Sequence, residues 1–217
     1  MIKAVIFDFD GLIVDTETAW YEAYKETMGF YETDLPLEQF VTCIGTDNTE
    51  LNAYFQSQLG ERYNINEIET KAKSLHEGKM KTPEAREGVK EYLEEARKSG
   101  YKIALASSSS KEWVTLYLEK LGLLHYFEAI ITGDDVAHVK PAPDLYVKAM
   151  EVLDVAPAEA VAFEDSLNGL QAALKAGVKC VIVPNPVTEA LAFEHHSLRL
   201  QSMLEKSLAD VIREIEQ

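Results

Sequence analysis

Short apolar runs that alternate with helical patterns constrain the fold of this chain most strongly. The runs are strand-sized and apolar on both faces, as in strands that helices cover on both sides. They lie at residues 3–9, 103–106, 129–132, 161–163 and 181–183. Strands that alternate with helices are typical of a mostly parallel sheet with right-handed crossovers and a ligand site at the carboxyl ends of the strands. The sequence therefore predicts an α/β fold.

The helical patterns between the later runs have recognisable ends. Thr82 and Pro83 offer an N-cap followed by proline at the first helical position, and the apolar residues up to Gly100 fall on one face. We therefore expect a helix from Thr82 to Gly100. Further helices are expected at residues 112–121, 143–153, 166–176 and 208–215. Residues 187–204 have the pattern of a polar surface connection with scattered apolar anchors.

Residues 16–80 interrupt the alternation. They contain helical patterns at residues 18–28, 37–43, 48–59 and 65–77, without a convincing strand. The simplest interpretation is a small helical cap domain, residues 16–80, inserted into a core domain of residues 1–15 and 81–217. Such an insert can lie over the strand ends.

Composition excludes several classes of protein. The 217 residues are 47% hydrophobic and carry a net charge of −16, which disfavours nucleic acid and anionic membranes as partners. No membrane span or signal peptide is recognised, so we expect a cytoplasmic protein, and nothing in the helical patterns requires a partner, so we expect a monomer. Cys43 and Cys180 are expected to be reduced.

Two aspartates follow the first predicted strand, in the stretch AVIFDFDGLIVDTE. Residues at positions i and i+2 of a strand face the same way, so Asp8 and Asp10 can project together. Two close carboxylates repel each other unless one is protonated or a divalent cation offsets the repulsion, and Mg²⁺ prefers such oxygen ligands. Capping of a turn at Gly11 would explain one acid, but not the pair.

Polar residues also follow the second predicted strand and precede a later helix. Ser107, with Ser108 behind it, stands where a hydroxyl and the following backbone amides can bind a phosphoryl oxygen, although serine-rich loops are common turns. Lys140 lies in a loop restricted by two prolines, which favours an aimed ammonium over an ordinary surface lysine.

The fourth predicted strand ends in two acids, Glu164 and Asp165, before a helix that Ser166 opens. Helix capping and compensation of the helix dipole would account for the serine and for one acid. The pair of acids at a strand end favours a further role in binding a cation.

Together these stretches resemble a known family. DFDGLIVDTE, ALASSSS, VKPAPD and FEDSLNG are similar, in this order, to the four motifs of the haloacid dehalogenase superfamily, closest to its β-phosphoglucomutase-like phosphatase branch. The resemblance spans about residues 4–184. It implies a Rossmann-like core with a small helical cap inserted after the first motif, which agrees with the separate interpretation of residues 16–80.

The resemblance also implies a division of chemical roles. Asp8 would be the nucleophile that forms an aspartyl-phosphate, and Asp10 the general acid that then serves as the base for water. Asp8, the backbone carbonyl of Asp10 and Asp165 would bind Mg²⁺, with Glu164 as a further ligand or behind them.

The phosphoryl oxygens would be held by Ser107, Ser108 and Lys140. The resemblance therefore implies a Mg²⁺-dependent phosphatase that acts on a small phosphorylated metabolite, such as a sugar phosphate.

The chain departs from the mutases of this branch. They use a cap histidine and a cap arginine to hold a second phosphate, and the corresponding positions here are Trp20 and Asn48. Hydrolysis is therefore favoured over the alternative of a phosphomutase. A phospho-receiver domain without turnover is a further alternative, opposed by the acid two residues after the nucleophile and by the helical insert.

The predicted cap offers candidates for substrate contact. They are Glu17, Trp20, Thr46 and Asn48, for each of which ordinary packing or solvation is the alternative. Asp15 is expected to cap the first cap helix. His76, His195 and His196 lack metal-ligand spacing and are expected at solvated helix ends or in loops.

Overall fold

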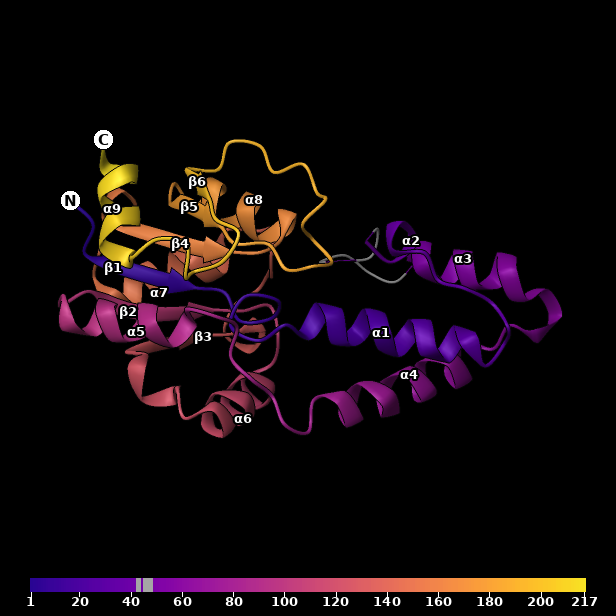
Figure 1. Cartoon of the computed structure of the whole chain (residues 1–217). Helices are drawn as coiled ribbons and strands as arrows, with labels where there is room; N and C mark the ends of the chain where they lie inside the picture. Colours follow the sequence, from indigo (N-terminus) through magenta and orange to yellow (C-terminus); the bar gives the residue numbers. More distant parts are fainter. Residues whose placement is uncertain (42–43, 45–48) are drawn as a thin grey trace.

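The computed structural model of the chain describes residues 1–41, 44 and 49–217. Within these residues, six strands form one parallel sheet in the order β3-β2-β1-β4-β5-β6 (Figure 1). The strands are β1 (Ala4–Phe7), β2 (Lys102–Ala106), β3 (Ala129–Ile131), β4 (Ala160–Glu164), β5 (Lys179–Ile182) and β6 (Leu198–Arg199). The α/β, Rossmann-like prediction is confirmed.

Helices cover both faces of the sheet. Successive strand residues face opposite sides of the sheet. Phe7 and Phe163 belong to the hydrophobic cluster on one face, and Ile6 and Ala162 belong to the cluster on the other face. The helices are α5 (Val89–Lys98), α6 (Lys111–Leu121) and α9 (Leu208–Glu216) on the first face, and α7 (Asp144–Leu153) and α8 (Leu167–Lys175) on the second. Burial on both faces explains why the strands are continuous apolar runs.

The central position of β1 sets the place of the site. Phe7 is in register with Leu105 of β2 and with Phe163 of β4. The residues that follow these three strands therefore meet at one edge of the sheet. Asp8 and Asp10 follow β1, the serine loop follows β2, and Asp165 follows β4.

In the described part of the chain, helices α1 to α4 lie beyond this edge of the sheet, and we call them the helical segment (Figure 1). They are α1 (Thr16–Gly29), α2 (Leu37–Val41), α3 (Thr49–Leu59) and α4 (Ile65–Lys79). They share a hydrophobic cluster separate from the two that flank the sheet. The Asp15 carboxylate accepts a hydrogen bond from the Thr18 amide (3.0 Å), so its predicted capping of α1 is confirmed. Within the described residues, none of the helices is both long and apolar enough to span a bilayer.

The helix predicted from Thr82 begins seven residues later, at Val89. The chain before it is instead tied to the turn that follows β1: the Arg86 amide donates to the Ile13 carbonyl (2.8 Å), and Gly88 has a φ of 81°. These tertiary contacts outweigh the local N-cap signal of Thr82 and Pro83.

The prediction of a polar surface connection at residues 187–204 was wrong in part. It contains β6, which adds a sixth parallel strand beside β5, and several of its side chains, including Val187 and Leu200, are buried. Two-residue strands are too short for a periodicity to reveal them in a sequence.

Candidate active site

Asp8 stands immediately after β1 and is held within the sheet edge. Its amide donates to the Phe163 carbonyl of β4 (3.0 Å), which continues the strand pairing by one residue. Asp8 is only 6% exposed, and its carboxylate forms an ion pair and hydrogen bond with the Lys140 ammonium. The predicted pair of Asp8 and Lys140 is therefore brought together.

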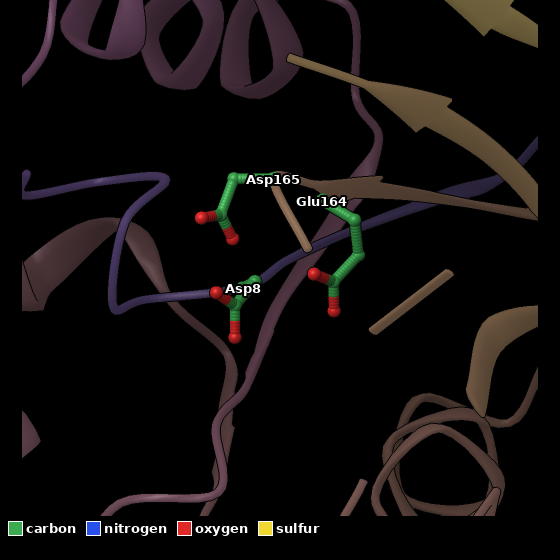
Figure 2. Close-up of side chains that lie close together, drawn as sticks. All are labelled: Asp8, Glu164 and Asp165. Carbon is green, nitrogen blue, oxygen red and sulfur yellow. The ribbon is translucent and has the colours of Figure 1, made fainter. Parts of the chain in front are cut away.

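Three buried carboxylates gather around this point (Figure 2). Asp8, Glu164 and Asp165 each offer an oxygen atom, and these atoms lie within 4.8 Å of one another. One oxygen of the Asp165 carboxylate, Oδ1, is buried and has no hydrogen-bond partner among the described residues. The other, Oδ2, accepts from the Asn185 side-chain amide (2.8 Å).

Lys140 neutralises part of this charge. Its ammonium lies 2.7 Å from Glu164 Oε1, which also accepts a hydrogen bond from the Tyr146 hydroxyl (2.5 Å). Lys140 is joined to Pro141 by a cis peptide bond. Oε1 of Glu164 is thus shared by the Tyr146 hydroxyl and the Lys140 ammonium, and the same ammonium contacts Asp8.

Burial dominates the electrostatics of the cluster. Burial raises the pKa of Asp8 to about 8, against the opposing effect of the Lys140 ammonium. Burial, together with the neighbouring carboxylates Asp8 and Glu164, raises the pKa of Asp165 well above its ordinary value. Three carboxylates and one lysine leave an excess of negative charge that a cation would stabilise.

Asp10 lies in a different environment from Asp8. Its Oδ2 accepts hydrogen bonds from the hydroxyls of Ser109 (2.7 Å) and Ser107 (3.3 Å). Its Oδ1 accepts one from the indole N–H of Trp113 (3.0 Å). All three donors are neutral and belong to the loop after β2 or to the first turn of α6. The two aspartates at the end of β1 therefore differ in their partners: Asp8 forms an ion pair, whereas Asp10 accepts hydrogen bonds from neutral groups.

A pocket with a volume of about 330 Å³ opens onto both aspartates. It is lined by Asp8, Asp10, Thr16, Glu17, Trp20, Ile44, Ser107, Ser108, Ser109, Val139, Lys140, Asp165, Ser166 and Asn168. Among these described residues Lys140 is the single cation. Burial, followed by the charges of Asp10 and Asp15, raises the pKa of Glu17 to about 7.

The candidates from the helical segment divide into two groups. Glu17 and Trp20 line the pocket, as expected for residues that contact a substrate. Thr46 and Asn48 lie outside the described residues, and so does Cys43. Cys180 is a buried free thiol.

The prediction that His76 is solvated was wrong. His76 is 1% exposed and stacks on Trp20, with ring centroids 3.8 Å apart and an interplanar angle of 8°. Its other neighbour is Trp113 of α6, at 5.9 Å. Burial lowers the pKa of His76 to about 4, so the ring is neutral at neutral pH. His195 and His196 do not belong to the acidic cluster found among the described residues.

Several residues of the site were not among those selected from the sequence. Ser109 and Trp113 hold Asp10, and Asn185 holds Asp165. Asn185 is itself fixed, because its side-chain oxygen accepts from the amides of Val187 (2.9 Å) and Thr188 (3.0 Å). Ser109 could have been found as part of the serine run, whereas the other two become visible only through contacts across the fold.

Comparison with known proteins agrees with this geometry. The sequence model of a family described as haloacid dehalogenase-like hydrolase matches residues 5–183. The chain is 48% identical to "Putative phosphatase YhcW" of Bacillus subtilis, over 96% of each chain. It is 32% identical to "Phosphorylated carbohydrates phosphatase" of Thermotoga maritima, over 82% of this chain and 83% of the relative.

A solved structure extends the similarity to the whole fold. The crystal structure of CbbY from Rhodobacter sphaeroides in complex with phosphate aligns with a TM-score of 0.77. It is 29% identical, and the alignment covers 100% of both chains.

Proposed function

Since the chain belongs to the family of haloacid dehalogenase-like hydrolases and is a phosphatase, we propose that it hydrolyses a small phosphomonoester, with Mg²⁺, through an aspartyl-phosphate at Asp8. We further propose that the helical segment is a cap domain, residues 16–80, inserted into a core of residues 1–15 and 81–217. The substrate class is a sugar phosphate or a similar metabolite.

The contrast between Asp8 and Asp10 is the observation that supports this function most directly. A nucleophile that attacks phosphorus must be ionised. Burial raises the pKa of Asp8 to about 8, and the Lys140 ammonium, together with Mg²⁺ when it is bound, would favour the ionised carboxylate. A group that exchanges a proton must be stable with and without it, and within the described residues Asp10 has only neutral hydrogen-bond partners. One pocket thus holds two carboxylates suited to different roles.

The residues present fit a divalent cation. Asp8 and Asp165 are buried carboxylates at one point, and Asp165 Oδ1 lacks a hydrogen-bond partner among the described residues, as expected of a ligand atom. Asp8, Asp165 and the backbone carbonyl of Asp10 would hold Mg²⁺, with Glu164 behind them. When bound, Mg²⁺ supplies positive charge that offsets the repulsion between the carboxylates and the phosphate.

The residues of the chain account for the first half of the reaction. Lys140, Ser107 and Ser108 bind the phosphoryl oxygens, and the Asp8 carboxylate attacks phosphorus. The bond between phosphorus and the leaving oxygen breaks, and Asp10 donates a proton to that oxygen. Glu164 keeps Lys140 beside Asp8 throughout, by the 2.7 Å ion pair.

The partners of Asp10 indicate which of its oxygens carries the proton. An indole N–H can only donate, so Oδ1 stays an acceptor in both protonation states. The serine hydroxyls at Oδ2 can rotate to donate or to accept. We therefore place the exchanged proton on Oδ2. In the second half, Asp10 takes a proton from the water that releases phosphate from Asp8.

The lining of the pocket supports a monophosphate whose remainder is uncharged. Lys140 is needed at the reacting phosphate, and no second cation lines the pocket among the described residues. A second phosphate of a bisphosphate would therefore lack a charged partner there. Glu17 and Trp20 offer a hydrogen-bonding group and an aromatic surface instead.

The proposal predicts release of inorganic phosphate from p-nitrophenyl phosphate and from members of a panel of sugar phosphates, in the presence of Mg²⁺. Asp8→Asn should reduce the rate at least a thousandfold, because an amide does not attack phosphorus. Asp34→Asn is the matched control, since it makes the same change on the exposed surface of the helical segment.

Three results would overturn the proposal. The first is that no phosphate is released from any compound. The second is that Asp8→Asn retains its activity, and the third is that chelation of divalent cations leaves the rate unchanged. Transfer of phosphate between positions of a hexose with little net release would instead favour the phosphomutase.

A further inference from the structure

Trp113 connects the proton-transfer group to the helical segment. Its indole nitrogen lies 3.0 Å from Asp10 Oδ1, and its ring lies against His76 of α4 at 5.9 Å. The His76 ring also stacks on Trp20 of α1, with ring centroids 3.8 Å apart. A continuous series of aromatic rings therefore leads from the pocket wall, through the helical segment, to Asp10.

The rings belong to both parts of the molecule. Trp20 and His76 come from the helical segment, whereas Trp113 and the Tyr117 ring packed on it at 4.4 Å come from α6. His76 is buried in this position, 1% exposed. The Trp113 ring is thus a surface on which the helical segment packs, and its N–H edge is free to serve Asp10.

The anchoring of α6 fixes the place of Trp113. The Ser110 hydroxyl accepts a hydrogen bond from the Trp113 amide (3.3 Å) and caps the helix, so the indole leaves the first turn of α6. The same loop carries Ser107 and Ser109, whose hydroxyls donate to the other oxygen of Asp10. The carboxylate is therefore held at both oxygens by the loop after β2 and the first turn of α6.

We infer that Trp113 is a positioning residue for the proposed reaction: it orients the Asp10 carboxylate toward the leaving oxygen of the substrate. This inference rests on the proposed function of Asp10. Without the indole N–H, Oδ1 loses the hydrogen bond that fixes the rotation of the carboxyl group, while Oδ2 keeps its serine partners. Proton donation becomes less efficient, whereas phosphate binding and attack by Asp8 are unaffected.

The leaving group separates such an effect from general damage. An alkoxide leaving group depends on a well-placed proton donor, whereas p-nitrophenolate leaves readily without one. The rate constant kcat/KM reports the steps up to the first irreversible bond cleavage. A misplaced general acid should therefore lower kcat/KM with a sugar phosphate and leave kcat/KM nearly unchanged with the aryl ester.

The test compares kcat/KM of the unmodified enzyme and Trp113→Phe on p-nitrophenyl phosphate and on the sugar phosphate that the unmodified enzyme hydrolyses fastest. Phenylalanine keeps an aromatic ring for His76 and removes the donor. We expect a decrease of about tenfold with the sugar phosphate and of less than about twofold with the aryl ester. Tyr117→Phe, which keeps the ring on the next turn of α6, should leave both values within about twofold. Equal losses with both substrates, or no loss with either, would overturn the inference.

A spectroscopic measurement tests the contact independently of activity. The chain contains two tryptophans, so Trp20→Phe leaves Trp113 as the only one. In this background, Asp10→Ala should shift the maximum of tryptophan emission, because the carboxylate at the indole N–H is removed. An unchanged emission spectrum would contradict the contact. If the unmodified enzyme has no phosphatase activity, the proposed function fails, and this spectrum still decides whether Trp113 holds Asp10.

Discussion

Gly169 shows how strongly single residues constrain the site. It lies in the first turn of α8, and a Cβ built on it would overlap the buried carboxylate of Glu164. Its φ is not in the left-handed region, so the available space, and not backbone freedom, requires glycine. Glu164 in turn holds Lys140 beside Asp8.

Gly169→Ala should therefore damage both stability and activity. Forcing a methyl group against a buried carboxylate costs about 1–3 kcal/mol of the free energy of unfolding, and the displaced Glu164 should lower kcat by about tenfold or more. Denaturant unfolding and steady-state kinetics measure these effects. In Gly78→Ala, the control in α4, the new Cβ meets no atom within 4 Å, so this variant should be about 0.5–1 kcal/mol more stable and equally active. Similar behaviour of the two variants would contradict the proposed role of Glu164.

Much of the site at this scale was predictable from the sequence. Asp8, Lys140 and Asp165 were selected from the sequence because paired acids at strand ends and a lysine in a proline-restricted loop have few structural explanations, and the structure places Lys140 and Asp165 beside Asp8. Trp113 and Asn185 were not, because a tryptophan in a helix or an asparagine after a strand is ordinary until the fold brings it to Asp10 or Asp165.

At the scale of elements, the alternation of apolar runs and helical patterns predicted five strands and the order of the helices. The errors arose where contacts between distant elements determine the local structure or the burial of a residue. The Arg86 segment, tied to the Ile13 carbonyl, delayed the start of α5, and β6 exists only because it pairs with β5. His76 was expected in solvent because a single histidine on α4 does not reveal that rings of α1 and α6 cover it.

The packing of α4 predicts a dependence of stability on pH. The pKa of His76 is about 4 in the folded chain and 6.5 ordinarily, because burial disfavours the charged ring between Trp20 and Trp113. Between these values the unfolded chain binds more protons, so this stability is complete above about pH 6.5 and is lost as the pH falls toward 4.

His76→Phe should remove this dependence and keep the stack. Between pH 7.5 and pH 5, the unmodified protein should lose about 2 kcal/mol more of its free energy of unfolding than the variant. Denaturant titrations at the two pH values measure the difference, and the other titrating groups are common to both proteins. Equal losses would show that His76 does not stay neutral in the folded chain.

At the scale of the whole molecule, the arrangement reconciles an acidic protein with an anionic substrate. The net charge of −16 repels phosphate, yet the pocket between the sheet edge and the helical segment contains Lys140 and carboxylates suited to a divalent cation. Local charge therefore outweighs the field of the whole chain. In the proposed mechanism, the phosphoryl group passes through an aspartyl-phosphate at Asp8.

Trapping that intermediate tests the central claim most directly. The enzyme is mixed with Mg²⁺ and the fastest substrate of the panel, quenched in acid within one turnover, and digested for mass spectrometry. With p-nitrophenyl phosphate, whose leaving group needs no proton donor, Asp10→Asn should increase the trapped amount, because Asp8 is still phosphorylated while water is no longer activated. We predict one phosphoryl group on the peptide that contains Asp8, and none in Asp8→Asn. Release of phosphate in the first turnover without any phosphorylated peptide, or a phosphoryl group on another residue, would contradict the account.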